Sequence, residues 1–345
     1  MRVQRLYQPF SKYVKGVYFR SFFFCVASLL AAGEGDFLSL QRRCSSLFKE
    51  RESSVVRVKG IYEGAERTSV QFGTGFFISD EGHVLTTASN ISGANSVLVA
   101  FHQASYPAKI LGFDPDTNFA LLKLTTLPKS FTSVALSSSP IEVGPCTMNL
   151  LMAFPRYCPV SPKLGMLAGS EGYYEDNVFP ANYLRTTWLA ADGEHGGPVF
   201  DLKGRLLGML ITSLPEIQSS YILPTPALLR LRDDILFGGE VKHGYVGLEV
   251  AQPARLQRGD IVIISNIQPD SPAAKAGLLK GDELLRFGSF DIASMGDVRN
   301  AAFFARPGEY VTLTIRRHGE ERQVNIQVAP QPEQHASKVG LSVSG

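Results

Sequence analysis

A glycine-rich segment holds a histidine whose side chain could do chemistry. Residues 193–198 read Gly-Glu-His-Gly-Gly-Pro, so His195 has glycine close by on both sides. An imidazole can exchange a proton near neutral pH, and it is also a common metal ligand. His195 could therefore act as a base, bind a metal, or fill a purely structural position.

The spacing of the other ligand types argues against a metal at His195. Zinc takes three or four ligands at close range. The six histidines are spread between positions 83 and 335 without a tight pair, and no Cys-x-x-Cys occurs. We therefore expect no metal and no cofactor, and we favour a structural histidine over a ligand.

The composition describes an ordinary globular chain. Of 345 residues, 44% are hydrophobic and 19% are charged, which suits two or three domains. A net charge of +2 does not favour electrostatic binding to nucleic acid. The 32 glycines and 20 prolines favour many turns and a strand-rich fold.

The elements that must position His195 are short strands. Residues 55–62 and 69–79 alternate between apolar and polar, and the turn 80–82 (Asp-Glu-Gly) leads into a strand at 83–86. Further strands are predicted at 97–101, 108–113, 119–124, 147–153, 184–189, 205–212 and 220–223. This spacing predicts an antiparallel barrel or sandwich.

A helix is predicted to close this first unit. Residues 226–237 begin with proline and are followed by two glycines, which suit the start and the end of a helix. Its expected apolar face consists of Leu228, Leu231, Ile235 and Leu236.

A smaller unit follows, from residue 242 to residue 328. Its predicted strands are 246–250, 261–267, 283–287, 310–316 and 322–328, and its predicted short helices are 271–277 and 294–305. About 85 residues suffice to fold alone, though only marginally.

The amino terminus has the pattern of a secretory signal peptide. Residues 1–20 contain five basic residues and no acidic one, and residues 21–32 form an apolar run. That run is shorter than the roughly 20 residues that cross a bilayer as a helix. We expect export, with cleavage near Ala32 or Gly33. The alternatives are a short uncleaved anchor and a wrongly assigned start of the chain.

Cleavage there would also change the cysteine count. Cys25 would be removed, which leaves Cys44, Cys146 and Cys158. This odd number leaves at least one thiol free or paired between chains. A bridge between Cys146 and Cys158 stays open at this point.

Two stretches resemble the HtrA (Deg) family. The first unit is similar to that family's trypsin-like protease domain, on the strength of residues 73–79 (Gly-Thr-Gly-Phe-Phe-Ile-Ser), 114–123 and the glycine loop 193–198. The second unit is similar to its PDZ domain, because residues 271–278 read Ser-Pro-Ala-Ala-Lys-Ala-Gly-Leu and Gly-Asp follows at 281–282. The resemblance spans about residues 53–328.

The resemblance implies a mainly β chain, a trypsin-like double antiparallel β-barrel followed by a smaller α+β PDZ domain. Together with the residue patterns, the predicted parts are a signal peptide at 1–33, a helix or linker at 34–52, a degenerate protease domain at 53–240, a PDZ domain at 241–330 and a flexible tail at 331–345.

The resemblance also implies that all three catalytic positions are substituted. The family's histidine falls on Ser89, its aspartate on Asn118 and its serine on His195. The backbone N–H groups of Gly193 and His195 would then correspond to the oxyanion hole. Three interpretations follow: an inactive, filled cleft; a rewired hydrolase in which His195 activates Ser89; and a misplaced alignment that hides a true triad.

We favour the inactive cleft on geometric grounds. Oxyanion donors at Gly193 and His195 face a carbonyl that is attacked from position 195, not from position 89. Loss of one such donor costs about 10²–10³ in rate. Asn118 cannot stabilise an imidazolium as a carboxylate does, and that change costs about 10⁴ in the triad template.

By the same resemblance, the second unit binds peptides. A PDZ domain adds the peptide as a strand and holds its terminal carboxylate in a backbone nest. The implied groove residues are Tyr245, Val246, Gly247, Leu248, Val250, Met295, Val298 and Ala302. The alternative is that these side chains are plain core and that Tyr245 closes the groove.

The preferred function is an exported HtrA-like pseudoprotease, in the periplasm or cell envelope, that binds C-terminal or unfolded peptides as a scaffold, holdase or regulator. The runner-up is an ATP-independent serine endopeptidase with a rewired site. The family resemblance adds a trimer, or an assembly with an active relative, as an implied partner. A membrane is a partner only if the N-terminal segment stays uncleaved.

Overall fold

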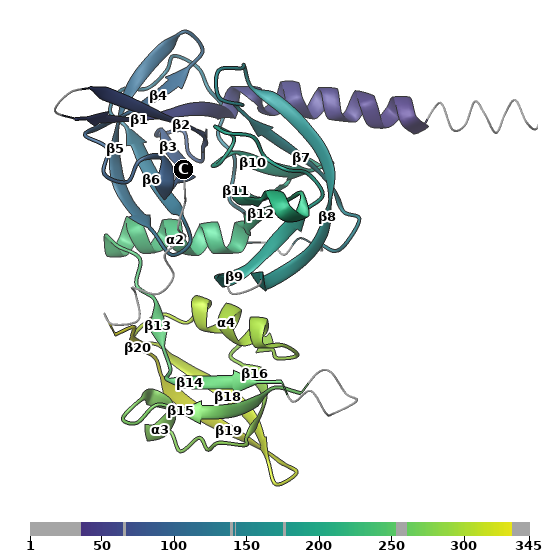
Figure 1. The fold of residues 1–345 in the computed structure, drawn as a ribbon, viewed down its shortest axis with the longest axis vertical. Helices are drawn as coiled ribbons and strands as arrows, with labels where there is room; N and C mark the ends of the chain where they lie inside the picture. The colour runs from purple at the N-terminus through teal and green to yellow at the C-terminus, as the bar shows by residue number, and fades with distance from the viewer. Residues whose placement is uncertain are drawn as a thin grey trace, which may run out of the picture. The chain divides into compact units, whose positions relative to one another are not determined.

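The computed structural model describes residues 36–64, 67–138, 141, 143–174, 177–252 and 261–332 (Figure 1). The predicted signal peptide lies outside the described residues, as does the predicted tail from residue 333 onward. Residues 36–51 are helical, which is one of the two structures expected there. The chain separates into a unit that ends at Ser46 and a unit that begins at Leu47. All elements named below belong to the second unit.

Strands β1 to β6 form a closed antiparallel barrel in the order β1-β2-β3-β6-β5-β4. Their bounds are β1 Val55–Glu63, β2 Thr68–Phe77, β3 His83–Thr87, β4 Ser96–Phe101, β5 Ala104–Asp114 and β6 Phe119–Leu124. In β4, Val97, Val99 and Phe101 are buried while their neighbours are not. Successive side chains of a strand point to opposite faces, so the alternation read from the sequence becomes the barrel interior.

Strands β7 to β12 form a second closed barrel in the order β10-β11-β12-β9-β8-β7. Their bounds are β7 Met148–Ala153, β8 Ser161–Tyr174, β9 Asn177–Thr186, β10 Pro198–Asp201, β11 Leu206–Leu214 and β12 Ser219–Pro224. Short helical turns are η1 Glu52–Ser54, η2 Ala88–Asn90 and η3 Pro215–Ile217. The mainly β double barrel predicted from the sequence is therefore confirmed.

The second barrel differs from the prediction in three strands. The strand expected at 184–189 is the end of β9 and stops at Thr186. Neither β8 nor β10 was predicted, because β8 contains a proline and several glycines and β10 has only four residues. Pairing with β7 and β9 holds β8 in place. Gly165 of β8 lies so close to Trp188 that a Cβ there would come within 2.4 Å of the Trp188 ring.

Helix α2 (Thr225–Gly238) follows the second barrel. Leu228, Leu231 and Ile235 are buried as predicted, but Leu236 is 41% exposed. Leu236 lies about 100° around the helix from Ile235, which turns it away from the covered face. Gly239 ends the helix in the left-handed region at φ +80°.

The remaining strands form the PDZ-like part. A sheet in the order β14-β15-β16-β18-β19 carries β17 on β16, and β13 pairs with β20. The bounds are β13 Gly244–Tyr245, β14 Leu248–Ala251, β15 Ile263–Ile267, α3 Pro272–Lys275, β16 Glu283–Phe287, β17 Phe290–Asp291, α4 Met295–Phe304, β18 Tyr310–Arg317, β19 Glu320–Gln327 and β20 Ala329–Pro330. Ser294 and Asp297 form a reciprocal capping box at the start of α4.

The structure also bears on the cysteine bridge and on membrane-spanning helices. Cys146 and Cys158 are both exposed and unbridged, so the bridge left open above is not formed. Within the residues that the structure describes, no helix has the length and apolar character needed to cross a bilayer.

Candidate functional site

The loop that carries His195 depends on glycine. Gly193 and Gly196 adopt φ +87° and +90°, where other residues are strained. A Cβ on Gly196 would also lie 2.1 Å from the carbonyl oxygen of Thr74, and one on Gly193 would lie 2.6 Å from the nitrogen of Arg156. The glycine pattern of residues 193–198 is thus a requirement of this loop shape, whatever residue 195 does.

The main chain of this loop is hydrogen-bonded to the first barrel. The N–H of Thr74 donates to the carbonyl oxygen of His195 at 2.9 Å, and its hydroxyl donates to Gly193 at 2.8 Å. Asn90 also donates from its amide to the carbonyl oxygen of His195, at 3.2 Å. Strand β2 and turn η2 together hold the loop in position.

A buried ion pair supports the loop from the other side. Glu194 is fully buried, and its Oε2 pairs with Nζ of Lys163 on β8 and accepts the N–H of Ala191 at 2.6 Å. The Nζ of Lys163 also donates to the carbonyl oxygen of Leu189 at 3.1 Å. The other carboxylate oxygen, Oε1, has no hydrogen-bond partner among the described residues.

The His195 ring has a serine neighbour rather than an acid. Its Nε2 lies 3.4 Å from the hydroxyl of Ser213, which is in turn 3.0 Å from the hydroxyl of Ser220. Burial lowers the pKa of His195, and the charges of Glu194 and Asp192 oppose that shift only in part. In the described part of the chain, no carboxylate hydrogen-bonds this ring. A catalytic imidazolium would therefore lack the partner that stabilises it.

Ser89 and Asn118 are in contact, but not as a catalytic pair. The backbone N–H of Ser89 donates to Oδ1 of Asn118 at 2.7 Å, and the Ser89 hydroxyl donates to Thr87 at 3.3 Å. Asn118 has φ +56°, a conformation that asparagine tolerates well, and its Nδ2 donates to the carbonyl oxygen of Ile211 at 3.3 Å. The structure thus joins Ser89 to Asn118, while the Ser89 hydroxyl is directed to Thr87 and not to His195.

Another serine–histidine pair lies on the β2–β3 hairpin. The hydroxyl of Ser79 is 2.7 Å from Nδ1 of His83, and Oε2 of Glu81 is 3.9 Å from the same nitrogen. A triad needs the serine and the carboxylate on opposite ring nitrogens. Because both groups here approach Nδ1, this pair is not a hidden triad.

The peptide bond between residues 192 and 193 has a fixed orientation. Its carbonyl oxygen accepts the N–H of Arg156 at 2.7 Å, and the Arg156 guanidinium lies 3.2 Å from the Asp192 carboxylate. Because C=O and N–H of a trans peptide point in opposite directions, the Gly193 N–H points away from Arg156. Within the described ranges, the N–H groups of Gly193 and His195 have no hydrogen-bond partner. Two backbone donors of the loop that carries His195 are therefore unpaired within these ranges.

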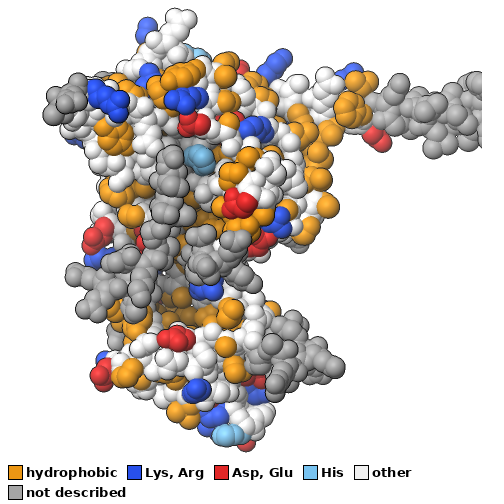
Figure 2. All heavy atoms as spheres, in the orientation of Figure 1, with side chains coloured by type: hydrophobic (Ala, Val, Ile, Leu, Met, Phe, Trp, Pro, Cys, Tyr) orange, Lys and Arg blue, Asp and Glu red, His pale blue; other side chains and the backbone are white. Residues whose placement is uncertain are grey.

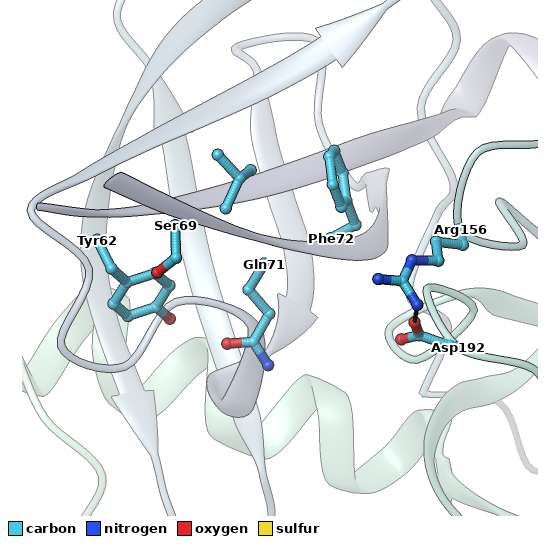
Figure 3. Close-up of a pocket in the computed structure, with 7 residues that line it drawn as sticks. Tyr62, Ser69, Gln71, Phe72, Arg156 and Asp192 are labelled. Atoms are coloured by element: carbon cyan, nitrogen blue, oxygen red, sulfur yellow. Dashed lines mark ion pairs between the residues drawn. The ribbon is translucent and has the colours of Figure 1, made fainter. Parts of the chain in front are cut away.

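A pocket of about 460 Å³ lies beside this loop. Figure 3 shows the Arg156–Asp192 ion pair on one side of it and residues of the β1–β2 hairpin on the other. Its lining residues are Tyr62, Ser69, Val70, Gln71, Phe72, Arg156 and Asp192. The mixed polar and aromatic lining suits an extended chain better than a compact apolar ligand.

The predicted groove residues lie on β13, β14, α4 and the turn between the two strands. Val246 and Val298 are buried in the core of the sheet, so these two are core side chains. Leu248, Val250 and Ala302 are only partly buried against that core, and Met295 is half-buried. The groove and core interpretations therefore each apply to part of the predicted set.

Gly247 lies at the turn that would hold a carboxylate. It has φ +76°, and a Cβ there would lie 2.2 Å from Cβ of Ser271 and 3.0 Å from the hydroxyl of Tyr245. In the part of the chain described, the N–H of Gly247 has no hydrogen-bond partner. A donor next to the edge strand β14 is what a peptide carboxylate requires.

One cluster was not found from the sequence. Asp114, Asp116 and His243 come together although His243 is far along the chain from both aspartates. The two aspartates are close in sequence, but no periodicity or motif connects them to His243. Only the tertiary structure reveals this group.

The chain is similar to known proteins in both of its domains. Residues 73–209 match the family model of the trypsin-like peptidase domain, and residues 244–328 match that of the PDZ domain. A probable periplasmic serine endoprotease DegP-like from Marinomonas sp. (strain MWYL1) is 28% identical over 295 residues, covering 79% of this chain and 61% of the relative. The chain is similar to the HtrA family in both of its domains.

A second DegP-like relative shows the same similarity. The DegP-like protein of Chlamydia trachomatis serovar D is 25% identical over 288 residues, covering 79% of this chain and 57% of its own. The chain thus spans about three-fifths of the length of the curated relatives it matches.

Solved structures of proteases share the fold. The HtrA-type protease AlgW with a tripeptide matches with a TM-score of 0.68 at 22% identity, over 84% of this chain and 97% of that one. The serine endoprotease from Yersinia pestis matches with a TM-score of 0.59 at 21% identity, over 84% and 98%. At this identity the likeness establishes the arrangement of strands and helices alone.

Proposed function

We propose that this HtrA-like chain is a non-catalytic protein that binds peptides. The observation that carries the proposal is His195, which stands in the family's nucleophile loop. The loop keeps its glycine geometry and its anchors on β2 and β8, yet it presents a half-buried imidazole without a carboxylate partner in the described residues. Ser89 and Asn118 are joined by a backbone hydrogen bond that serves structure instead of proton transfer.

The proposed binding surface is the edge of the second sheet. Among the described strands, β14 is the terminal one in the order β14-β15-β16-β18-β19, so one side of it is open to an added strand as far as these residues show. The half-buried Leu248, Val250 and Met295 supply an apolar wall, and the N–H of Gly247 supplies a donor for a terminal carboxylate. The proposed ligand is therefore a C-terminal or unfolded segment of another protein.

We place this activity outside the cytoplasm. The amino-terminal pattern is that of a signal peptide, and the relatives from Marinomonas and Chlamydia are named periplasmic. There the chain acts as a scaffold, as a holdase or as a regulator of an active HtrA protein. Assembly into trimers, or with such a relative, is part of the same proposal.

The non-catalytic part is tested with the full chain. Purified protein is incubated with casein and, separately, with a fluorophosphonate probe that labels activated serines. We expect no cleavage and no label. Cleavage that survives purification and disappears in Ser89→Ala would overturn the proposal.

The binding part is tested with a library of C-terminal peptides. We expect the full chain to select a subset of them and Val250→Lys to lose that binding. Glu249→Lys is the matched control, because Glu249 is the exposed neighbour on the same strand. Loss of binding in both variants, or no selection by the wild type, would remove the peptide-binding role.

The alternative function is a serine endopeptidase with a rewired site. Two observations favour it: the relatives are named endoproteases, and the N–H groups of Gly193 and His195 remain without partners in the described ranges. The casein and probe experiments separate it from the preferred function.

A further inference from the structure

Asp114, Asp116 and His243 bring three possible metal ligands to one point. One oxygen of each aspartate and one ring nitrogen of His243 all lie within 4.8 Å of one another. Asp114 ends strand β5, Asp116 lies in the turn before β6, and His243 lies between α2 and β13. The group is separate from the cleft residues Ser89 and His195.

The distances fit a small divalent ion. Nε2 of His243 is 3.0 Å from Oδ1 of Asp114 and 3.8 Å from Oδ2 of Asp116. Ligand atoms that sit about 2.1 Å from a tetrahedral zinc ion are separated by roughly 3.4 Å. The two observed distances lie on either side of that value, so a small adjustment of the side chains would bring three ligands to bonding distance.

The Asp114 carboxylate is already oriented for this role. It is buried, and its Oδ2 accepts the N–H of Thr117 at 3.2 Å and the Thr117 hydroxyl at 2.6 Å. These bonds leave Oδ1 directed at His243. Hydrogen bonds that fix a ligating carboxylate in this way are typical of protein metal sites.

Two carboxylates and one imidazole face one another at this point. Arg230 is a buried cation that interacts with Asp114, but it is also paired with Asp234 at 3.4 Å. A divalent cation would relieve the repulsion between the two carboxylates.

We propose that Asp114, Asp116 and His243 form a binding site for a divalent transition-metal ion, with zinc as the best match to one imidazole and two carboxylates. Three protein ligands leave a fourth position for water. Mg²⁺ and Ca²⁺ prefer oxygen ligands alone, so the imidazole argues against them.

Bound metal would connect two functional regions. The turn that holds Asp114 and Asp116 continues directly into Asn118, which contacts Ser89. His243 immediately precedes Gly244, where the PDZ match begins. The ion would therefore fix the segment that leads into the PDZ-like part against the turn beside the cleft.

The experiment is a zinc titration of the metal-free full chain by calorimetry, repeated with Co²⁺ to read the coordination geometry from its visible absorption. We expect one site that is lost in His243→Asn and at least about tenfold weaker in Asp116→Asn. His318→Asn, at an exposed histidine, is the control and should bind as the wild type does. Zinc should also raise the melting temperature of the wild type but not that of His243→Asn.

A milder variant tests the site without removing a ligand, so that a loss of binding is not confused with misfolding. Thr117→Val keeps all three ligands but removes the hydroxyl that orients Asp114, and it should weaken zinc binding about tenfold. Equal zinc stoichiometry and affinity in the wild type and in His243→Asn would place the ion elsewhere, at the cysteines for example, and would end the proposal. An absence of zinc binding to the wild type would do the same.

Discussion

The backbone N–H of Ser89 donates a 2.7 Å hydrogen bond to Oδ1 of Asn118. The same Asn118 side chain donates from Nδ2 to the carbonyl oxygen of Ile211, on β11 of the second barrel. One amide thus accepts from turn η2 and donates to β11. An aspartate could make the first bond but not the second. Asparagine is therefore suited to connecting η2 with β11 as a structural brace, and not to orienting a catalytic base.

Asn118→Ala should lower the free energy of unfolding by about 1–3 kcal/mol, because it removes both bonds and leaves the Ile211 carbonyl without this donor. Urea unfolding of the full chain measures the change. Asn118→Asp keeps the acceptor for Ser89 but faces a carboxylate toward a carbonyl oxygen, so it too should destabilise. If Asn118→Asp were more stable than the wild type, the brace interpretation would be wrong.

Restoring the family's triad should create a serine hydrolase. The variant Ser89→His/Asn118→Asp/His195→Ser places the expected residues on a loop that already has its glycine geometry. Removing a triad costs about 10⁶ in rate, so even an imperfect restoration should exceed the wild type by at least about 100-fold. Casein cleavage and fluorophosphonate labelling at residue 195 measure this.

The three single variants are the controls for that experiment, since each should remain inactive. A correctly folded triple variant without label at position 195 would mean that Ser89, Asn118 and His195 are not the triad positions. Circular dichroism establishes that the variant is folded.

Lys163→Met should destabilise the chain by about 2–4 kcal/mol, because it leaves the fully buried Glu194 carboxylate without its cation. The magnitude is set below that of a fully buried pair because the Lys163 side chain is 30% exposed. The double variant Lys163→Met/Glu194→Leu should recover most of the loss, since no charge is then left buried. Chemical denaturation measures all three proteins, and a neutral Lys163→Met would contradict a structural role for the pair.

Stability should fall in mild acid because of His195. Burial lowers the pKa of His195 below its usual 6.5, so the unfolded chain takes up a proton that the folded chain resists. The contribution is fully present above pH 6.5 and is lost as the pH falls toward the folded-state pKa. His195→Gln should flatten the decline in stability between about pH 7 and about pH 5.

The matched control is His318→Gln, at an exposed position, which should leave the profile of the wild type unchanged. The measurement is urea unfolding at several pH values. A profile for His195→Gln that coincides with that of the wild type would show that this imidazole titrates as an exposed one does.

The strands of the first barrel were the most predictable elements. In β4 every second residue is apolar, and Val97, Val99 and Phe101 are all buried, because alternation maps directly onto the two faces of a strand. Strand β8 has no such signal. Its glycines and proline read as loop, and its place in the sheet comes from pairing with β7 and β9.

The candidate site, too, could be predicted from the sequence only in part. The order of short motifs around Gly73, Asp114 and Gly193 was enough to indicate the family resemblance, and the assignment of Ser89, Asn118 and His195 to the triad positions stays a prediction. It could not indicate that the Ser89 hydroxyl is directed to Thr87, or that the His195 ring lies beside Ser213. The first contact depends on the backbone shape of turn η2, and the second depends on how β11 packs beside the loop that carries His195.

The sequence by itself determined the strand-rich fold, the glycines that shape the loop and the histidine at position 195, because these follow from residue type and local spacing. Only the tertiary structure decided which distant side chains meet. It paired Lys163 with Glu194 and His243 with Asp114 through contacts between segments far apart in the chain. No local pattern encodes such contacts, because they arise when the strands pair and pack.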